Sequence, residues 1–176
     1  MTKNKIIFIV IILLALLLII QFKPKKSSLY NVNVDGHAYV FKYNPKISIK
    51  IPCNNPEGIQ VMAFKSNRFV IIFNGTNSKD NALFSVIGQN IVLKLKPYFE
   101  FQGIYKNYTA AEIDNFTYNN GDFIIYLKGP NTGANGTYVK LDGNKVLISG
   151  NTTDEAQMAG DKFILTVMGL YEKSHS

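Results

Sequence analysis

Short segments of the chain alternate apolar and polar residues, which is the pattern of β-strands that bury one face. Residues 32–34 alternate up to Asp35-Gly36, a dipeptide typical of tight hairpin turns, and residues 38–43 return beside them. Residues 46–51 place isoleucine at every second position, which predicts a half-buried strand. We expect further strands at 69–73, 91–95, 99–101, 123–127, 138–141 and 146–149.

Two segments carry the signals that begin a helix. Asn55-Pro56 offers an N-cap and a proline at the first helical position, so a short early helix is expected there. Thr152 and Glu155 form a capping box, and apolar residues then recur at helical spacing as far as Gly169, which suits a helix end. The second pattern predicts a C-terminal helix that covers the core.

These elements together predict the α+β class. The expected fold is a mostly antiparallel sheet with a C-terminal helix and one short early helix, preceded by a single transmembrane helix. A β-sandwich is the alternative arrangement of the same strands. The globular domain would cover residues 30–170, after a polar linker at 23–29 and before a flexible tail at 171–176.

An apolar segment at the N-terminus predicts a membrane anchor. Residues 6–20 are apolar without a break, and lysines flank the run on both sides. Residues 6–22 at helical rise span roughly 25 Å, and the flanking lysines can reach the lipid headgroups. A cleavable signal peptide is the competing interpretation, but residues 21–26 offer no small residues for a cleavage site. The prediction is therefore a signal anchor at 6–22 that contacts membrane lipid, with a cytoplasmic tail at 1–5.

Five Asn-X-Thr sequences, the acceptor motif of N-glycosylation, follow this apolar run. Roughly two would arise by chance, so an Asn-rich surface with accidental threonines is the alternative. The lysines on the two sides of the run nearly balance, and charge alone does not orient the anchor. The motifs favour a C-terminal domain outside the cytoplasm. The glycosylation candidates are Asn74, Asn107, Asn115, Asn135 and Asn151.

Composition narrows the classes of function. The net charge is +7, but residues 27–176 hold 14 of the 19 basic residues and all 12 acids, which leaves this stretch at only +2. The basic excess flanks the apolar run instead of marking a folded surface, so a nucleic-acid partner is not expected. One Cys and two His predict neither an internal disulfide nor a metal or other cofactor.

A glycine-rich segment at 129–137 separates two expected strands. Its small residues would allow close backbone approach to a partner, or its glycines simply supply positive φ angles in a connection. Residues 98–118 are rich in aromatic side chains and would be buried core or a partner surface. The candidate partner contacts are Gly129, Pro130, Asn131, Thr132 and Gly133.

Catalytic groupings are hard to assemble from this sequence. His37 and His175 are expected on the solvated surface, and Cys53 is expected to be a small, partly buried apolar residue. Glu112 and Asp114 are close enough in sequence for a pair of glycosidase-type carboxylates if they line a cleft. We therefore expect no enzymatic activity, with a carbohydrate-active domain as the rival.

Residues 125–134, 146–150 and 159–165 read as a strand with a Gly/Pro loop, a second strand and a helix. In these residues the C-terminal part resembles archaeal single-pass cell-surface and S-layer-like envelope proteins. The resemblance implies an archaeal host and a non-enzymatic role outside the cytoplasm. The predicted function is a membrane-anchored structural or interaction domain of the cell envelope, whose partner is an envelope protein or a glycan. The alternatives are an accessory subunit of a larger membrane complex and a carbohydrate-binding or carbohydrate-active domain.

Overall fold

The computed structural model of the chain describes residues 29–73, 78–112 and 117–172. The first two strands, β1 (Tyr30–Val34) and β2 (His37–Phe41), form an antiparallel hairpin. Asp35 and Gly36 occupy its turn with φ angles of 51° and 84°, which is the geometry that the Asp-Gly dipeptide predicts. The expected hairpin is therefore confirmed.

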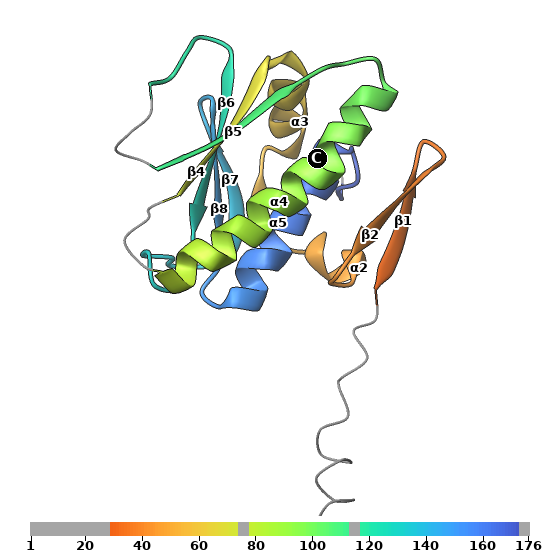
Figure 1. Cartoon of the computed structure of the whole chain (residues 1–176). Helices are drawn as coiled ribbons and strands as arrows, with labels where there is room; N and C mark the ends of the chain where they lie inside the picture. Colours follow the sequence, from red (N-terminus) through yellow and green to blue (C-terminus); the bar gives the residue numbers. More distant parts are fainter. Residues whose placement is uncertain (1–28, 74–77, 113–116, 173–176) are drawn as a thin grey trace, which may run out of the picture.

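A second sheet of six strands forms the centre of the described chain (Figure 1). Its order is β3-β7-β8-β6-β4-β5. Only β7 and β8 pair antiparallel within it, while every other neighbouring pair is parallel. The prediction of a mostly antiparallel sheet is therefore wrong. The strands are β3 (Cys53–Asn54), β4 (Arg68–Phe73), β5 (Asn107–Glu112), β6 (Asp122–Lys128), β7 (Tyr138–Asp142) and β8 (Lys145–Ser149).

Three long helices cover one face of this sheet, which confirms the α+β class. They are α3 (Pro56–Lys65), α4 (Ser78–Phe101) and α5 (Thr153–Val167), and a single turn, α2 (Pro45–Ser48), precedes them. Alternate strand residues such as Phe69, Ile71 and Phe123 join the helices in one core, while Val70 and Ile124 face the opposite side. Because helices cover the sheet, the β-sandwich alternative is wrong.

The helix starts predicted at Asn55 and Thr152 are both confirmed. The side chain of Asn55 accepts a hydrogen bond from the Gly58 N–H at 2.9 Å. Thr152 and Glu155 exchange both bonds of the capping box at the start of α5. Gly169 follows α5 with a φ of 78°, a conformation that glycine adopts without strain.

The strand predicted at residues 46–51 is wrong, because α2 begins there. The side chain of Asn44 accepts from the Lys46 N–H at 3.0 Å, and Pro45 takes the first helical position. This Asn-Pro start matches the one at Asn55-Pro56, and its local hydrogen bond outweighs the alternation of isoleucines that follows. Ile47 is exposed as a result, whereas Ile49 is packed against the core.

The strands predicted at 91–95 and 99–101 are also wrong, since both lie in α4. Residues of α4 that recur every three or four positions are buried, as a helix that packs by one face requires. Pro97 lies inside α4 although it has no N–H to donate to the Leu93 carbonyl. A helix between β4 and β5 also explains their pairing, because a crossover of this length returns the chain parallel. The buried residues are Leu83, Phe84, Ile87, Ile91, Leu95, Tyr98 and Phe99.

The predicted anchor at residues 6–22 lies outside the described residues. No helix within residues 29–73, 78–112 and 117–172 combines the length and apolar character that a membrane crossing requires.

Candidate functional site: an apolar groove beside an open sheet edge

Strand β5 forms one edge of the six-stranded sheet and pairs only with β4. Its residues Asn107–Glu112 contain neither proline nor a basic residue, which are devices that commonly block a sheet edge. Ala110, near the middle of the strand, is exposed. Among the described residues, no strand pairs with the outer side of β5, so another strand could hydrogen-bond to its backbone there.

An open groove of about 660 Å³ lies beside this edge. It is bounded by Ile71 and Phe73 of β4, by Phe84 and Leu93 of α4, and by Tyr108 of β5. No charged side chain is among the described residues that line it. A groove of this size and apolar character is suited to binding an apolar ligand or a protein segment.

The groove exists because α4 packs closely against α5, away from β5. At Gly160 of α5 a Cβ atom would come within 2.9 Å of Ile87, so the absence of a side chain allows the two helices to approach. Figure 1 shows α4 and α5 crossing the same face of the sheet. Within the described chain, β5 has no helix of its own above it, and the space next to α4 stays open.

Exposed apolar residues extend the groove onto α4. Leu93 is 71% exposed and Val86 is 43% exposed, and the two lie seven positions apart on the same side of the helix. Tyr108 stacks on Phe69 at 5.3 Å between ring centroids, and its hydroxyl is buried without a hydrogen-bond partner among the described residues. Burial raises the pKa of Tyr108, so this hydroxyl stays protonated. The surface is apolar, with a single buried donor beneath it.

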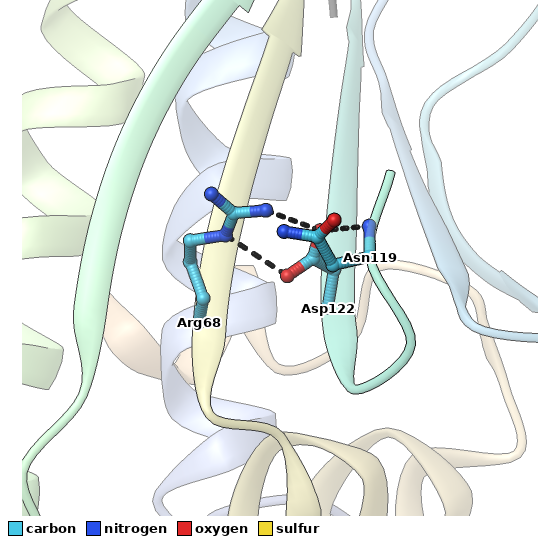
Figure 2. Close-up of polar contacts among 3 residues, drawn as sticks. All are labelled: Arg68, Asn119 and Asp122. Atoms are coloured by element: carbon cyan, nitrogen blue, oxygen red, sulfur yellow. Dashed lines mark hydrogen bonds and ion pairs between the residues drawn. The ribbon is translucent and has the colours of Figure 1, made fainter. Parts of the chain in front are cut away.

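An ion pair fixes the strands beside this edge at their amino ends (Figure 2). Arg68 donates to both carboxylate oxygens of Asp122, from Nε at 2.9 Å and from Nη2 at 2.7 Å. The Asn119 N–H donates to the same carboxylate at 2.8 Å. These bonds, those from Arg68 first, lower the pKa of Asp122. They fix the register of β4 against β6, and β4 in turn positions β5.

A second charged cluster joins α4 and α5. Asp161 is only 5% exposed, and burial raises its pKa to about 6. Lys94, Lys42 and the Tyr43 backbone N–H favour the charged carboxylate but do not outweigh this effect. Burial likewise lowers the pKa of Lys94. The cluster lies between the helices and not in the groove, so we assign it a role in packing.

The glycine-rich segment predicted as a partner contact is held by its own hydrogen bonds. Asp80, near the start of α4, accepts from the Asn131 N–H at 3.0 Å and from Asn131 Nδ2 at 2.8 Å. Gly129 donates to Thr132 Oγ1 at 2.8 Å, and a Cβ on Gly129 would lie 2.8 Å from Asp80 Oδ2. Gly133 has a φ of 81°. The structure thus explains Gly129, Asn131, Thr132 and Gly133 by the loop itself, while Pro130 is exposed.

The glycosylation candidates that the structure describes are all on the surface. Asn107, Asn135 and Asn151 are exposed, as attachment of a glycan requires. Asn135 also accepts a hydrogen bond from the Tyr138 hydroxyl at 3.0 Å. Asn74 and Asn115 lie outside the described residues.

The residues considered for catalysis do not come together in one place. Glu112 is exposed at the end of β5, and Asp114 and His175 lie outside the described residues. His37 is half-buried and stacks on Phe101 at 3.6 Å between ring centroids, which differs from the solvated surface residue predicted. Cys53 is partly buried against the core, as predicted. In the part of the chain that the structure describes, no cluster of three His, Cys, Asp or Glu side chains could hold a metal ion.

The groove was missed from the sequence because its residues were assigned to the wrong elements. A strand at 91–95 would put Leu93 on the same face as Ile91 and Leu95, whereas α4 exposes Leu93 and buries the other two. The signal that could have found it is the helical spacing of the apolar residues that follow Leu83. No family model, no curated protein and no solved structure matches this chain.

Proposed function

We propose that this chain is a non-enzymatic interaction domain of the cell envelope, anchored in the membrane by residues 6–22 and lying outside the cytoplasm. The domain binds a protein partner through the groove between α4 and β5. The observation that carries this proposal is the uncharged groove beside an unblocked edge strand. A strand of a partner would pair with β5 and bury its apolar side chains in the groove.

The character of the groove favours this function over its rivals. A carbohydrate-active site would need carboxylates facing a cleft, whereas the side chains lining this groove are mainly aliphatic and aromatic. An accessory subunit of a membrane complex would also use such a groove. This rival function therefore differs from the proposed one in the partner that binds, while the binding site is the same. The exposure of Asn107, Asn135 and Asn151 supports the location outside the cytoplasm, as does the resemblance to archaeal surface proteins.

The location is tested by treating intact cells with protease and mapping glycans on the released domain. We expect the domain to be released without lysis, with glycans at Asn135 and Asn151, the exposed candidates outside β5. Digestion only after lysis, together with bare asparagines at all five motifs, would contradict the location.

The groove is tested by photo-crosslinking in intact cells from a reactive amino acid placed at Gln89, an exposed residue of the groove. We expect a discrete crosslinked product that is lost when Leu93→Lys is added. The matched control is Ile47→Lys, because Ile47 is 56% exposed on α2 and does not line the groove. Crosslinking that survives Leu93→Lys would rule out the groove as the binding site.

A further inference from the structure

We infer that the partner in the groove is a second copy of this chain, paired antiparallel through β5 about a twofold axis at Thr109. This inference rests on the proposed function, since it assigns an occupant to the same groove. An isologous contact uses one surface twice, so that surface must be complementary to itself. The edge strand, the groove and the exposed side of α4 are one continuous surface that meets this requirement.

The register follows from which side chains share a face of the sheet. Tyr108 and Ala110 pair with Phe69 and Ile71, whose side chains join the core under the helices, so they lie on the helix-covered face. Thr109 pairs with Val70 and lies on the other face. Residues opposite one another in antiparallel strands point to the same face. A twofold axis at Thr109 satisfies this rule and places Thr109 opposite the partner's Thr109. Tyr108 then lies opposite the partner's Ala110.

Charge is complementary in this register. Lys106 precedes β5 and Glu112 ends it, so antiparallel pairing brings Lys106 opposite the partner's Glu112. The Lys106 ammonium donates to the carbonyls of Phe64 and Ser66, and neither acceptor is a carboxylate. The ammonium also lies 5.0 Å from the centre of the Phe99 ring, and of its three donors one remains for the partner's Glu112. The symmetric contact repeats this pair, and no like charges face each other along the strand.

Shape is complementary at the centre of the contact. Thr109, Ala110 and Ala111 are small, and Asn107–Glu112 contains no proline, so two β5 backbones can approach to hydrogen-bonding distance. Leu93 and Gln89 line the groove above this point. A second α4 brought in by the twofold axis would lie over the joined edges and cover Leu93, the most exposed aliphatic side chain of the helix.

The first test measures the association of the full chain in detergent micelles by sedimentation equilibrium. We expect a monomer–dimer equilibrium. Leu93→Lys and Ala110→Lys should each raise the dissociation constant at least tenfold, and Ile47→Lys should leave it unchanged. Leu93, Ala110 and Ile47 are all exposed, so each variant should remain folded, and thermal unfolding of each variant checks this.

The second test identifies the register. In a Cys53→Ser background, Thr109→Cys places two thiols opposite each other across the twofold axis, and mild oxidation should give a covalent dimer. Ile47→Cys in the same background is the control and should remain monomeric under identical oxidation.

Three outcomes separate this inference from the proposed function. A monomer at all concentrations with no disulfide at position 109 would overturn the second copy as occupant. If the crosslink from Gln89 then joins a different protein and still depends on Leu93, the groove remains the binding site. If neither dimer nor crosslinked product forms, both the inference and the proposed function fail.

Discussion

Asp161 places a carboxyl group between α4 and α5, where only 5% of the residue is exposed. Burial raises its pKa from 3.8 to about 6, so the charged carboxylate is less favourable in the folded than in the unfolded chain. The protonated Asp161 carboxyl therefore stabilises the fold in full only below the pKa that this group has in the unfolded chain. This contribution is lost as the pH rises through the folded value. Lys94 and Lys42 limit the loss because they attract the carboxylate.

Asp161→Asn should remove this dependence. Between about pH 4 and pH 6 the free energy of unfolding of the unsubstituted chain should fall relative to that of the variant, by up to ~3 kcal/mol. Urea unfolding at half-unit pH steps measures the difference. Parallel curves for the two chains across this range would mean that Asp161 ionises as it does in solvent.

Asp122 should respond to pH in the opposite direction. Arg68 holds its pKa below 3.8, so Asp122 stabilises the fold above that pH and the contribution is lost as the pH falls. The Tm of the unsubstituted chain should exceed that of Asp122→Asn at neutral pH, and the gap should narrow below pH 4. Scanning calorimetry at both pH values tests this, and a gap that does not change with pH would contradict the effect of the ion pair.

At the scale of elements, the crossing of α4 and α5 depends on Gly160. A Cβ at Gly160 would press on Ile87 at 2.9 Å, whereas a Cβ at Gly88 would make an ordinary contact with Ile71 at 3.6 Å. Both glycines lie inside helices and gain the same helix propensity on change to alanine. We expect Gly88→Ala to be the more stable variant by about 1–3 kcal/mol, measured by urea unfolding. Equal stabilities would mean that the helices separate without cost.

Element boundaries that carry local signals could be predicted from the sequence. The hairpin turn at Asp35, the cap at Asn55 and the capping box at Thr152 each act within four residues, and all three are confirmed. The strand predicted at 46–51 is wrong because the alternation of isoleucines there competes with a helix start at Asn44-Pro45. Local hydrogen bonds decided the structure there.

The groove could not be predicted in the same way. Its walls come from β4, α4 and β5, and it exists only because α4 approaches α5 at Gly160. A prediction of strands at 91–95 and 99–101 leaves out α4. Without this helix as the connection between β4 and β5, their parallel pairing cannot be predicted either. A contact between distant helices leaves no pattern in a short window of sequence, so the site lay beyond what periodicity reveals.

At the scale of the whole molecule, hydrogen bonds join the first described elements to the last helix that the structure describes, α5. Tyr43, just after β2, donates to Asp154 Oδ1 at 2.7 Å and lies 3.0 Å from Gln157 Oε1. Lys162 of α5 donates to the Ile49 carbonyl at 2.7 Å. These bonds join segments more than 100 residues apart, and they fasten the N-terminal hairpin and α2 onto α5.

Tyr43→Phe should loosen this junction without emptying the core. We expect a loss of about 1 kcal/mol in the free energy of unfolding and faster amide hydrogen exchange in β1 and β2. Amides of β6, at the centre of the sheet, serve as the internal control. Their exchange rates should change only as far as the free energy of global unfolding changes. Unchanged exchange in the hairpin would show that apolar packing alone holds it.

The position of α5 in the chain also sets when the domain can close. Ten consecutive residues, Ala159 to Met168, are buried, and all but Met168 belong to α5, which follows every described strand in the chain. Until α5 has emerged, the sheet lacks part of its cover and the hairpin cannot fasten to α5. The described domain therefore cannot complete its core during synthesis until the segment that carries α5 has emerged.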